Sequence, residues 1–266
     1  VYVGTKTNTG TDADKAGLTN GTLKVIAVTG FADNNGTTFD ELSDLTTRTT
    51  AITSGTAFTL STTVCTTFSR PEDGAWDPTN PSRFYFVTTD RLDQATLGLG
   101  TQIGRTRLWR LNFTDITNPD LGGTIDLLAT GGVGNDATMW DNLCVTGDGK
   151  LVIQEDPGNT AHNAKVWFYD PATGSLTKAL QHDPARFGST SQPATAPFNA
   201  DEESSGVIDV TAIFGGNYTT GQRYYLIADQ SHYSIAAPLV EGGQLLLVQQ
   251  TEAQTGPSSS ATPYLV

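Results

Sequence analysis

The sequence lacks two features that would place the protein in a membrane or on nucleic acid. No apolar run approaches the ~20 residues that a helix needs to cross a bilayer. Basic residues are scarce: 15 Lys and Arg stand against 28 Asp and Glu, which gives a formal net charge of −13. Nucleic-acid binding needs a basic surface stripe. We therefore expect no membrane span and no nucleic-acid partner, whereas such a carboxylate-rich chain can supply oxygen ligands to Ca²⁺.

Cysteine, histidine and the familiar catalytic motifs are also scarce. Two cysteines, Cys65 and Cys144, are too few for a disulfide framework, and their strand-like surroundings favour small buried side chains, although one disulfide between them stays open. No Gly-x-Ser-x-Gly elbow, Walker loop, dinucleotide glycine pattern or His-Glu-x-x-His sequence occurs. Of the three histidines, which most often just satisfy backbone groups, His232 is the strongest candidate because it follows a strand-end carboxylate.

Charged residues make up only 16% of the chain, against about 25% in an average globular protein. Threonine, serine, asparagine and glycine take their place, and this mixture favours strands and tight turns over helices. The composition is similar to that of exported bacterial proteins, so we expect a secreted, periplasmic or extracellular location. The chain opens directly on a strand-like Val1-Tyr2-Val3 without an initiator Met, which favours a processed product or a fragment.

Paired strand-like segments recur four times along the chain. They are 1–6 with 21–28, 84–90 with 107–113, 151–156 with 164–170, and 224–229 with 243–249. Their irregular spacing suits propeller blades with loop insertions better than a tight repeat. We therefore predict an all-β protein, a single β-propeller domain over residues 1–266 or the C-terminal part of one. About four blades would lie in this chain and six in the complete protein, with a four-bladed ring as the alternative and 256–266 as a tail.

Oxygen-bearing side chains stand repeatedly at the ends of the predicted strands. Asp141 and Asn142 begin one strand, Glu155 and Asp156 end the next, and Glu203 precedes a later one. Because successive blades would deliver these ends to one place, we expect them to form a metal site, and oxygen ligands are those that Ca²⁺ prefers. The alternatives are a turn role for Asn142, a loop cap for Asp156 and a solvated acidic loop around Glu203.

Arg70-Pro71-Glu72 is the most informative short motif. On an extended chain, residues two apart point to the same side, so Arg70 and Glu72 would face one ligand. Arginine matches phosphate through paired hydrogen bonds, and a nearby carboxylate would hold a cation that neutralises the same phosphate. The alternative is an Arg70–Glu72 salt bridge that braces a loop.

Taken together, these segments resemble the PhoX-type alkaline phosphatase family and its uncharacterised bacterial relatives. The resemblance covers what corresponds to the C-terminal half of such proteins and is carried by 1–5, 15–21, 70–90, 140–142, 154–165, 182–188, 202–210 and 240–245. It implies a six-bladed β-propeller with a central cluster of calcium and iron ions that hydrolyses phosphate monoesters. Arg70 would contact phosphate and Glu72 would bind metal, with Asp141, Asn142, Glu155 and Glu203 as further ligands or their supports.

The sequence departs from that family in one respect. Members carry further metal ligands, including a cysteine for iron, in an N-terminal half that this sequence lacks, and neither Cys65 nor Cys144 matches that position. An N-terminal half that binds as a separate segment is therefore an expected partner, beside a phosphate-ester substrate. The leading hypothesis is a metal-dependent phosphomonoesterase that uses calcium and, by the resemblance, iron. The alternatives are a non-catalytic, calcium-stabilised extracellular propeller for binding or assembly, and another calcium-dependent propeller hydrolase.

Overall fold

The described part of the protein is built from β-sheets. The computed structural model describes residues 1–6, 9–32, 52–89, 106–132, 136–158, 160–251 and 264–265. Strands account for 51% and helices for 7%, whereas an average domain has more helix than strand, so the predicted all-β class is confirmed. Within the described ranges no helix is both long enough and apolar enough to cross a membrane.

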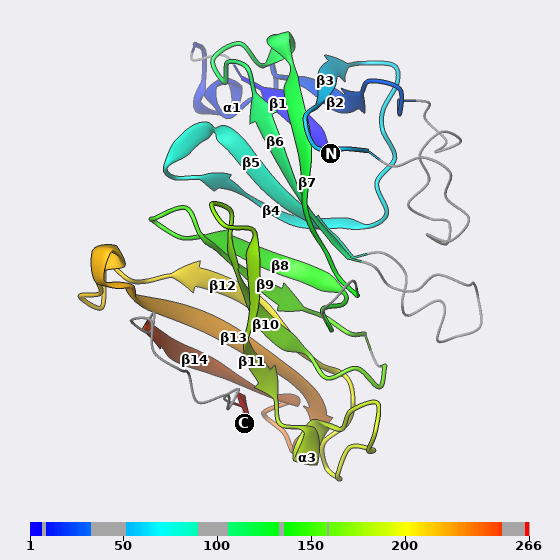
Figure 1. Ribbon diagram of the computed structural model, residues 1–266, viewed down its shortest axis with the longest axis vertical. Coiled ribbons are helices and arrows are strands. Elements are labelled where there is room, and N and C mark those ends of the chain that lie inside the picture. Colours follow the sequence, from blue (N-terminus) through cyan, green and yellow to red (C-terminus); the bar gives the residue numbers. More distant parts are fainter. Residues whose placement is uncertain are drawn as a thin grey trace.

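The first sheet has seven antiparallel strands (Figure 1) in the spatial order β1-β2-β3-β7-β6-β5-β4. Their bounds are β1 (Tyr2–Thr5), β2 (Thr22–Val28), β3 (Thr56–Ser61), β4 (Pro71–Asp77), β5 (Asn80–Thr88), β6 (Arg107–Phe113) and β7 (Gly123–Thr130). Strands β4 to β7 follow one another as a meander, and β3 attaches the β1–β2 hairpin to β7. The strand β4, which carries the predicted Glu72, therefore lies at one edge of this sheet.

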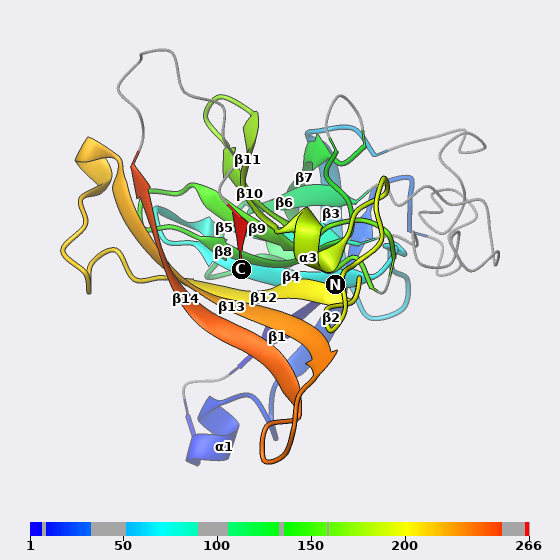
Figure 2. The ribbon, with the colours of Figure 1, turned by 90° about the horizontal axis from the view of Figure 1, so that it is seen from below.

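Two smaller sheets follow along the chain. The second has the order β15-β11-β10-β9-β8, with β8 (Trp140–Val145), β9 (Leu151–Glu155), β10 (Lys165–Asp170), β11 (Ser175–His182) and β15 (Tyr264–Leu265). The third has the order β12-β13-β14, with β12 (Glu202–Asp209), β13 (Gln222–Ser234) and β14 (Glu241–Thr251). Figure 2 shows this third sheet from below, with its long strands β13 and β14 on the outside.

All four predicted strand pairs form. They are β1 with β2, β5 with β6, β9 with β10, and β13 with β14. The pairs are spread over three sheets, because the β1–β2 hairpin joins the sheet that already holds β5 and β6. The described strands thus show stacked antiparallel sheets, one of them strongly curled. Of the predicted tail, only β15 lies among the described residues, where it pairs with β11.

Three apolar clusters hold the sheets together. The first lies inside the seven-stranded sheet, the second between that sheet and the β8–β11 sheet, and the third between β8–β11 and β12–β14. Strand β5 shows why the sequence folds this way: Phe86 faces the first cluster while its neighbours Tyr85 and Val87 face the second. Alternate residues of a strand point to opposite faces, so the continuous run of apolar residues buries both faces.

Short helical segments lie in the connections between strands. They are α1 (Asp12–Lys15), η1 (Pro119–Leu121), α3 (Pro184–Phe187) and η2 (Tyr218–Thr220). The helix α3 begins after Asp183, whose Oδ1 accepts a hydrogen bond from the backbone N–H of Ala185 at 2.9 Å, and Pro184 occupies the first helical position. Such an N-cap followed by proline is a strong helix-start signal, and it explains why the turn predicted at 184–188 forms. The turn predicted at 40–48 lies outside the described residues.

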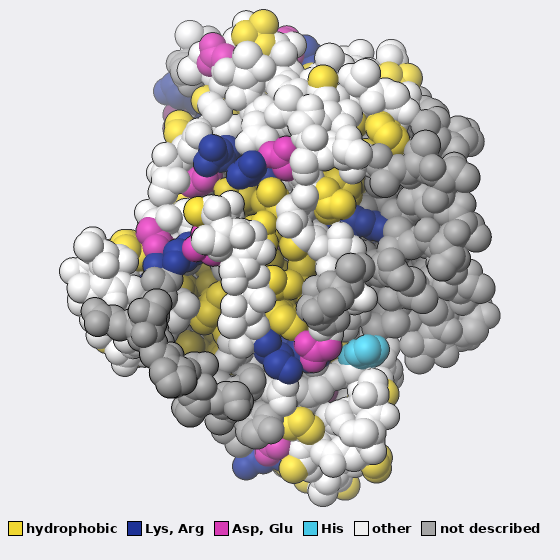
Figure 3. Space-filling model, viewed as in Figure 1, with side chains coloured by type: hydrophobic (Ala, Val, Ile, Leu, Met, Phe, Trp, Pro, Cys, Tyr) yellow, Lys and Arg dark blue, Asp and Glu magenta, His cyan; other side chains and the backbone are white. Residues whose placement is uncertain are grey.

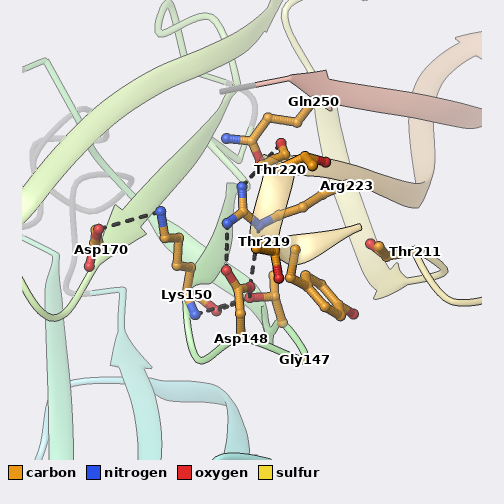
Figure 4. A network of polar contacts seen from close by, with 12 residues as sticks. Gly147, Asp148, Lys150, Asp170, Thr211, Thr219, Thr220, Arg223 and Gln250 are labelled. Carbon is orange, nitrogen blue, oxygen red and sulfur yellow. Dashed lines mark hydrogen bonds and ion pairs between the residues drawn. The ribbon is translucent and has the colours of Figure 1, made fainter. Parts of the chain in front are cut away.

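A buried ion pair joins the second and third sheets (Figure 4). The guanidinium of Arg223 on β13 contacts both carboxylate oxygens of Asp148, which lies in the β8–β9 turn, and its Nη1 donates to the carbonyl of Gly221 at 3.3 Å. The Arg223 side chain is only 2% exposed. This pair fixes how the β8–β9 turn sits against β13.

The outer face of the third sheet is apolar and open to solvent. Ile208, Leu226 and Leu247 form a cross-strand row on β12, β13 and β14, and Ile208 and Leu247 are 57% and 48% exposed. Leu245, which like Leu247 lies on β14, is 68% exposed. Large exposed apolar patches commonly mark interaction surfaces. No described strand packs over this row.

Candidate functional site

Three acidic residues occupy the same place on three neighbouring strands. Glu72, Asp141 and Glu203 are each the second residue of their strand, β4, β8 and β12 respectively. Strand β4 lies beside β8, and β8 lies beside β12; Figure 1 shows the three following one another across the sheets. Each of the three sheets therefore contributes one carboxylate near the start of such a strand.

The charges of these residues act on one another. Burial first, and then repulsion from Glu72, Asp156 and Glu203, raise the pKa of Asp141 to about 7, whereas the positive charge of Arg70 opposes the rise. Four carboxyl groups and one guanidinium therefore form a single electrostatic cluster, which we call the acidic cluster. Repulsion among partly buried carboxylates favours the uptake of protons or of a cation.

Glu203 and Asp156 repel each other within the acidic cluster. The negative charge of Asp156 helps to raise the pKa of Glu203 above its ordinary value. Burial comes first among the causes that raise the pKa of Glu203, followed by the charge of Asp156; the hydroxyl of Ser205 donates to its Oε1 and opposes the rise. A bound cation would relieve the repulsion between these two carboxyl groups.

Arg70 and Glu72 form an ion pair, with 3.3 Å between Nε and Oε1. Both side chains are about one-third exposed, so the pair can open toward a ligand at small cost. Arg70 has a φ of +52°, and Met139, just before β8, has a φ of +48°. Backbone in this region is costly for residues other than glycine and is concentrated at functional sites. Both strained residues adjoin the acidic cluster.

A frame of buried threonines holds these two strained segments in place. Thr89 donates its backbone N–H to the carbonyl of Arg70 at 3.0 Å and its hydroxyl to the carbonyl of Trp140 at 2.7 Å. Thr106 accepts the backbone N–H of Trp140 at 3.0 Å and donates to the carbonyl of Thr88 at 2.8 Å. The residues before Glu72 and Asp141 are therefore fixed by a shared hydrogen-bond network.

Two more polar residues support the cluster. Asn142 donates its amide to Oδ2 of Asp141 at 2.7 Å, so it holds the carboxylate in place. Asp73 accepts the backbone N–H of Leu143 at 3.0 Å through Oδ2 and that of Gly74 at 2.7 Å through Oδ1. Asp73 thereby ties β4 to β8, and its carboxylate is engaged in joining the sheets.

The structure places Glu155 apart from the acidic cluster. Its carboxylate is fully buried, accepts hydrogen bonds from Trp167 Nε1 at 2.7 Å and Thr138 N at 2.9 Å, and lies 3.5 Å from Lys165 Nζ. It is not among the charges that act on Asp141, whereas its neighbour Asp156 is. Adjacent residues at a strand end point to opposite sides, so only one of the two can face the cluster. The sequence pattern selected Glu155 as a ligand; the geometry favours Asp156.

Glu155 gives the protein a pH-dependent stability. Burial raises its pKa to about 7, although Lys165 and the two hydrogen bonds oppose the rise. The folded protein therefore holds a proton that the unfolded chain releases near pH 4.5, and the free energy of unfolding should fall by about 3 kcal/mol as pH rises across the window from 4.5 to about 7. In Glu155→Gln, urea denaturation at one pH below and one above this window should show a smaller fall. The exposed Asp12→Asn should keep the full fall, and an unchanged fall in Glu155→Gln would contradict this account.

The histidines and cysteines lie outside the acidic cluster or at its border. His182 is buried, with Nε2 2.6 Å from Asp229 Oδ1; Ser231 hydrogen bonds to the same Asp229 oxygen rather than to the histidine, so this group is not a nucleophilic triad. His232 is bonded to Glu241 at 3.1 Å and its charge acts on Glu203. No disulfide joins the two cysteines. Burial raises the pKa of Cys144 to about 12, so that side chain is a thiol.

The acidic cluster offers oxygen donors, which suit a hard cation such as Ca²⁺. Within the described residues, no three His, Cys, Asp or Glu side chains already surround one metal position. The carboxylates of Glu72, Asp141, Asp156 and Glu203 would therefore turn toward a cation on binding. A cation would relieve the repulsion that these carboxyl groups exert on Asp141, and in this respect the residues fit it. The chain matches no protein-family model and no curated protein.

Sequence reasoning missed Ser205 and the supporting role of Asp73. It includes Asp156 as a coordinating residue, with a loop cap as the alternative, but period-two alternation alone does not say which of 155 and 156 faces inward. On β12, a bulge between Ser204 and Val207 shifts the pairing register. Simple alternation along this strand therefore does not give the face on which Ser205 lies. A signal that could have favoured Asp156 over Glu155 is its position directly after the last buried strand residue, where the chain leaves the sheet.

Proposed function

We propose that this protein is a metal-dependent hydrolase of phosphate monoesters, with Arg70 and the acidic cluster as its active site. The observation that carries the proposal is the meeting of four carboxyl groups, delivered by different strands, with one arginine at the same end of the stacked sheets. Phosphoryl transfer needs cations to neutralise the phosphate and a planar donor to orient it. This cluster can provide both.

The roles of the residues follow from their chemistry. Glu72, Asp141, Asp156 and Glu203 would hold calcium; when bound, it would neutralise phosphate charge and polarise the phosphoryl group. Iron, which the PhoX-type resemblance implies, is proposed as a second metal on that ground alone. Arg70 would leave Glu72 and donate its paired N–H groups to two phosphate oxygens, where it stabilises charge in the transition state.

The finer architecture is proposed with it. Strands β4, β8 and β12 would be inner strands of three blades of a β-propeller that has six in the complete protein. The open apolar row of Ile208, Leu226 and Leu247 would then be covered by a further sheet, for which an N-terminal half bound as a separate segment is the proposed partner. A secreted, periplasmic or extracellular location would give such a protein access to calcium.

Metal content and activity test the proposal together. We would measure calcium and iron by elemental mass spectrometry on extensively dialysed protein, and hydrolysis of p-nitrophenyl phosphate before and after chelation. Retained calcium, loss of hydrolysis on chelation and its return with added calcium are expected. Protein that retains calcium but never hydrolyses phosphate esters would refute the enzyme and leave the alternative below.

Calcium affinity should rise with pH, because the cation binds the carboxylate form of Asp141. With its pKa at about 7, titration calorimetry should give an affinity about tenfold higher near pH 8 than near pH 6. Asp141→Asn should bind more weakly and lose most of this dependence, while Asp12→Asn on the exposed helix α1 should behave as the parent. An affinity independent of pH in the parent protein would contradict the assignment of Asp141.

The alternative function is a non-catalytic, calcium-stabilised extracellular propeller for binding or assembly. The Arg70–Glu72 ion pair favours it, since it engages the phosphate-binding group, as does the exposed apolar row on the third sheet. Under this alternative, calcium raises the melting temperature, but Arg70→Ala changes only stability. Under the enzyme proposal, Arg70→Ala also raises KM for the phosphate ester.

A further inference from the structure

A pocket opens between the second and third sheets at the end opposite to the acidic cluster. Its volume is about 290 Å³, and residues of β9, β10, β11, β13 and β14 line it. Figure 3 shows hydrophobic side chains recessed between ridges on this face of the molecule. Leu151, the first residue of β9, lines the pocket, while Asp156 of the acidic cluster follows the last. The length of β9 separates the two sites by roughly 15 Å.

The floor of this pocket is aromatic. Phe168 on β10 and Tyr225 on β13 have ring centroids 5.5 Å apart with an interplanar angle of 37°. Tyr225 is buried, whereas Phe168 is only half-buried and presents part of its ring to the pocket. Such a surface packs well against the C–H face of a ring-shaped ligand.

The rim of the pocket is polar but carries no excess charge. Lys150 and Asp170 pair with each other, with 3.5 Å between Nζ and Oδ2, so their charges cancel (Figure 4). Hydroxyl groups of Thr173, Ser175 and Thr177 line the same side. Across from them, Gln250 accepts the hydroxyl of Tyr225 through Oε1 at 2.7 Å, which orients its amide Nε2 to donate elsewhere. The pocket therefore offers donors and acceptors without selecting a charged ligand.

The walls are held rigidly before any ligand arrives. The buried Arg223–Asp148 pair lies behind Gln250 and Lys150 (Figure 4), and Thr146 donates to Asp148 Oδ1 at 2.7 Å. Preorganised walls lower the entropy lost on binding. The volume lies just below the usual range of about 300–1,000 Å³ for ligand pockets, so a single small ring fits better than a chain.

We propose that this pocket binds a neutral, hydroxyl-rich ring of the size of one hexose. Its C–H face would pack on Phe168, and its hydroxyl groups would hydrogen bond to Thr177, Ser175, Gln250 and the Lys150–Asp170 pair. The site is independent of the proposed phosphatase activity, because no residue of the acidic cluster lines it.

Saturation-transfer NMR and titration calorimetry with methyl β-D-glucopyranoside, methyl α-D-mannopyranoside and methyl β-D-galactopyranoside test the proposal. At least one should bind saturably with a Kd on the order of 1 mM, as expected for so small a ligand. The exposed Thr177→Arg would place a long charged side chain in the pocket and should weaken this binding at least about tenfold, or 1.4 kcal/mol. Thr59→Arg, an equally exposed threonine on β3, should bind as the parent.

Three outcomes would overturn the proposal. The first is no saturable binding of any of the three sugars at about 50 mM. The second is binding that survives Thr177→Arg in a protein whose circular dichroism is unchanged, which would place the sugar elsewhere. The third is equal binding of cyclohexanol, which has the ring but lacks most of the hydroxyl groups. Gln250→Ala keeps the test informative if Thr177→Arg folds poorly, since it removes a single donor from the rim.

Discussion

Replacing Glu72 with glutamine is expected to abolish phosphatase activity while leaving the protein folded. Glu72 is about one-third exposed and its side chain pairs only with Arg70 among the ion pairs described, so the stability lost should be within about 1 kcal/mol. The activity lost should be far larger, at least about 100-fold in kcat/KM, because one negative ligand of the cation disappears and Arg70 loses the partner that orients it. Hydrolysis of p-nitrophenyl phosphate at saturating calcium measures the first effect, and urea denaturation the second.

The control for this variant is Asp12→Asn, which removes one carboxylate from the exposed helix α1 and should retain full activity. Calcium binding, measured on the same Glu72→Gln protein, separates the two functions under consideration. The enzyme proposal expects weaker binding together with lost turnover. Unchanged turnover in a folded Glu72→Gln protein would refute the enzyme proposal. If the parent protein shows no turnover but Glu72→Gln binds calcium more weakly than the parent does, the non-catalytic propeller is favoured.

The four strand pairs could be predicted because these segments obey simple local rules, whereas β3, β7 and β11 were not predicted. Runs such as 84–87 and 151–153 are continuous apolar segments flanked by turn residues, and both of their faces are indeed buried. Local pattern does not encode which hairpin joins which sheet. The β1–β2 hairpin reads like an independent unit, yet it attaches through β3 to β7, a pairing between segments far apart in the chain.

The candidate residues of the site came from the same kind of local pattern. Glu72, Asp141 and Glu203 stand at the starts of three strands, β4, β8 and β12, and the structure places β4 beside β8 and β8 beside β12. Asn142 belongs with them as a hydrogen-bond donor to Asp141. Glu155 and Asp156 were separable only by knowing which way β9 faces. A single residue of register exchanges a buried structural carboxylate for one that can meet a cation.

The two kinds of buried carboxylate also differ in what surrounds them. Glu155 is satisfied by Trp167, Thr138 and Lys165, so its charge has partners within the fold. Among the described residues, the charges with the largest effect on Asp141 are those of three acids, Glu72, Asp156 and Glu203, and of one cation, Arg70. A group of like charges that raises the electrostatic energy of the folded protein without stabilising the fold is typical of functional sites. This difference is the reason for assigning function to Asp141 and stability to Glu155.

The largest expected effect on stability belongs to Asp148. Asp148→Ala would remove the carboxylate that the Arg223 guanidinium, 2% exposed, contacts through both oxygens, and removing one partner of a buried ion pair costs about 3–5 kcal/mol. Burial alone would raise the pKa of Asp148, but the hydrogen bonds of Arg223 and Thr146 lower it below its usual value, so the pair also loses strength as pH falls toward 4 and below. The free energy of unfolding from urea denaturation at neutral pH measures the loss.

A matched exposed pair provides the control. Lys24 and Asp120 form an ion pair in which Asp120 is 56% exposed, and Asp120→Ala should cost no more than about 1 kcal/mol. Equal losses in the two alanine variants would contradict a special role for the Arg223–Asp148 pair. If the loss of the ion pair is the cause, Arg223→Met combined with Asp148→Leu should recover most of the stability, because neither charge of the pair then remains buried. If lost packing between β13 and the β8–β9 turn is the cause, the double variant should stay as unstable as Asp148→Ala.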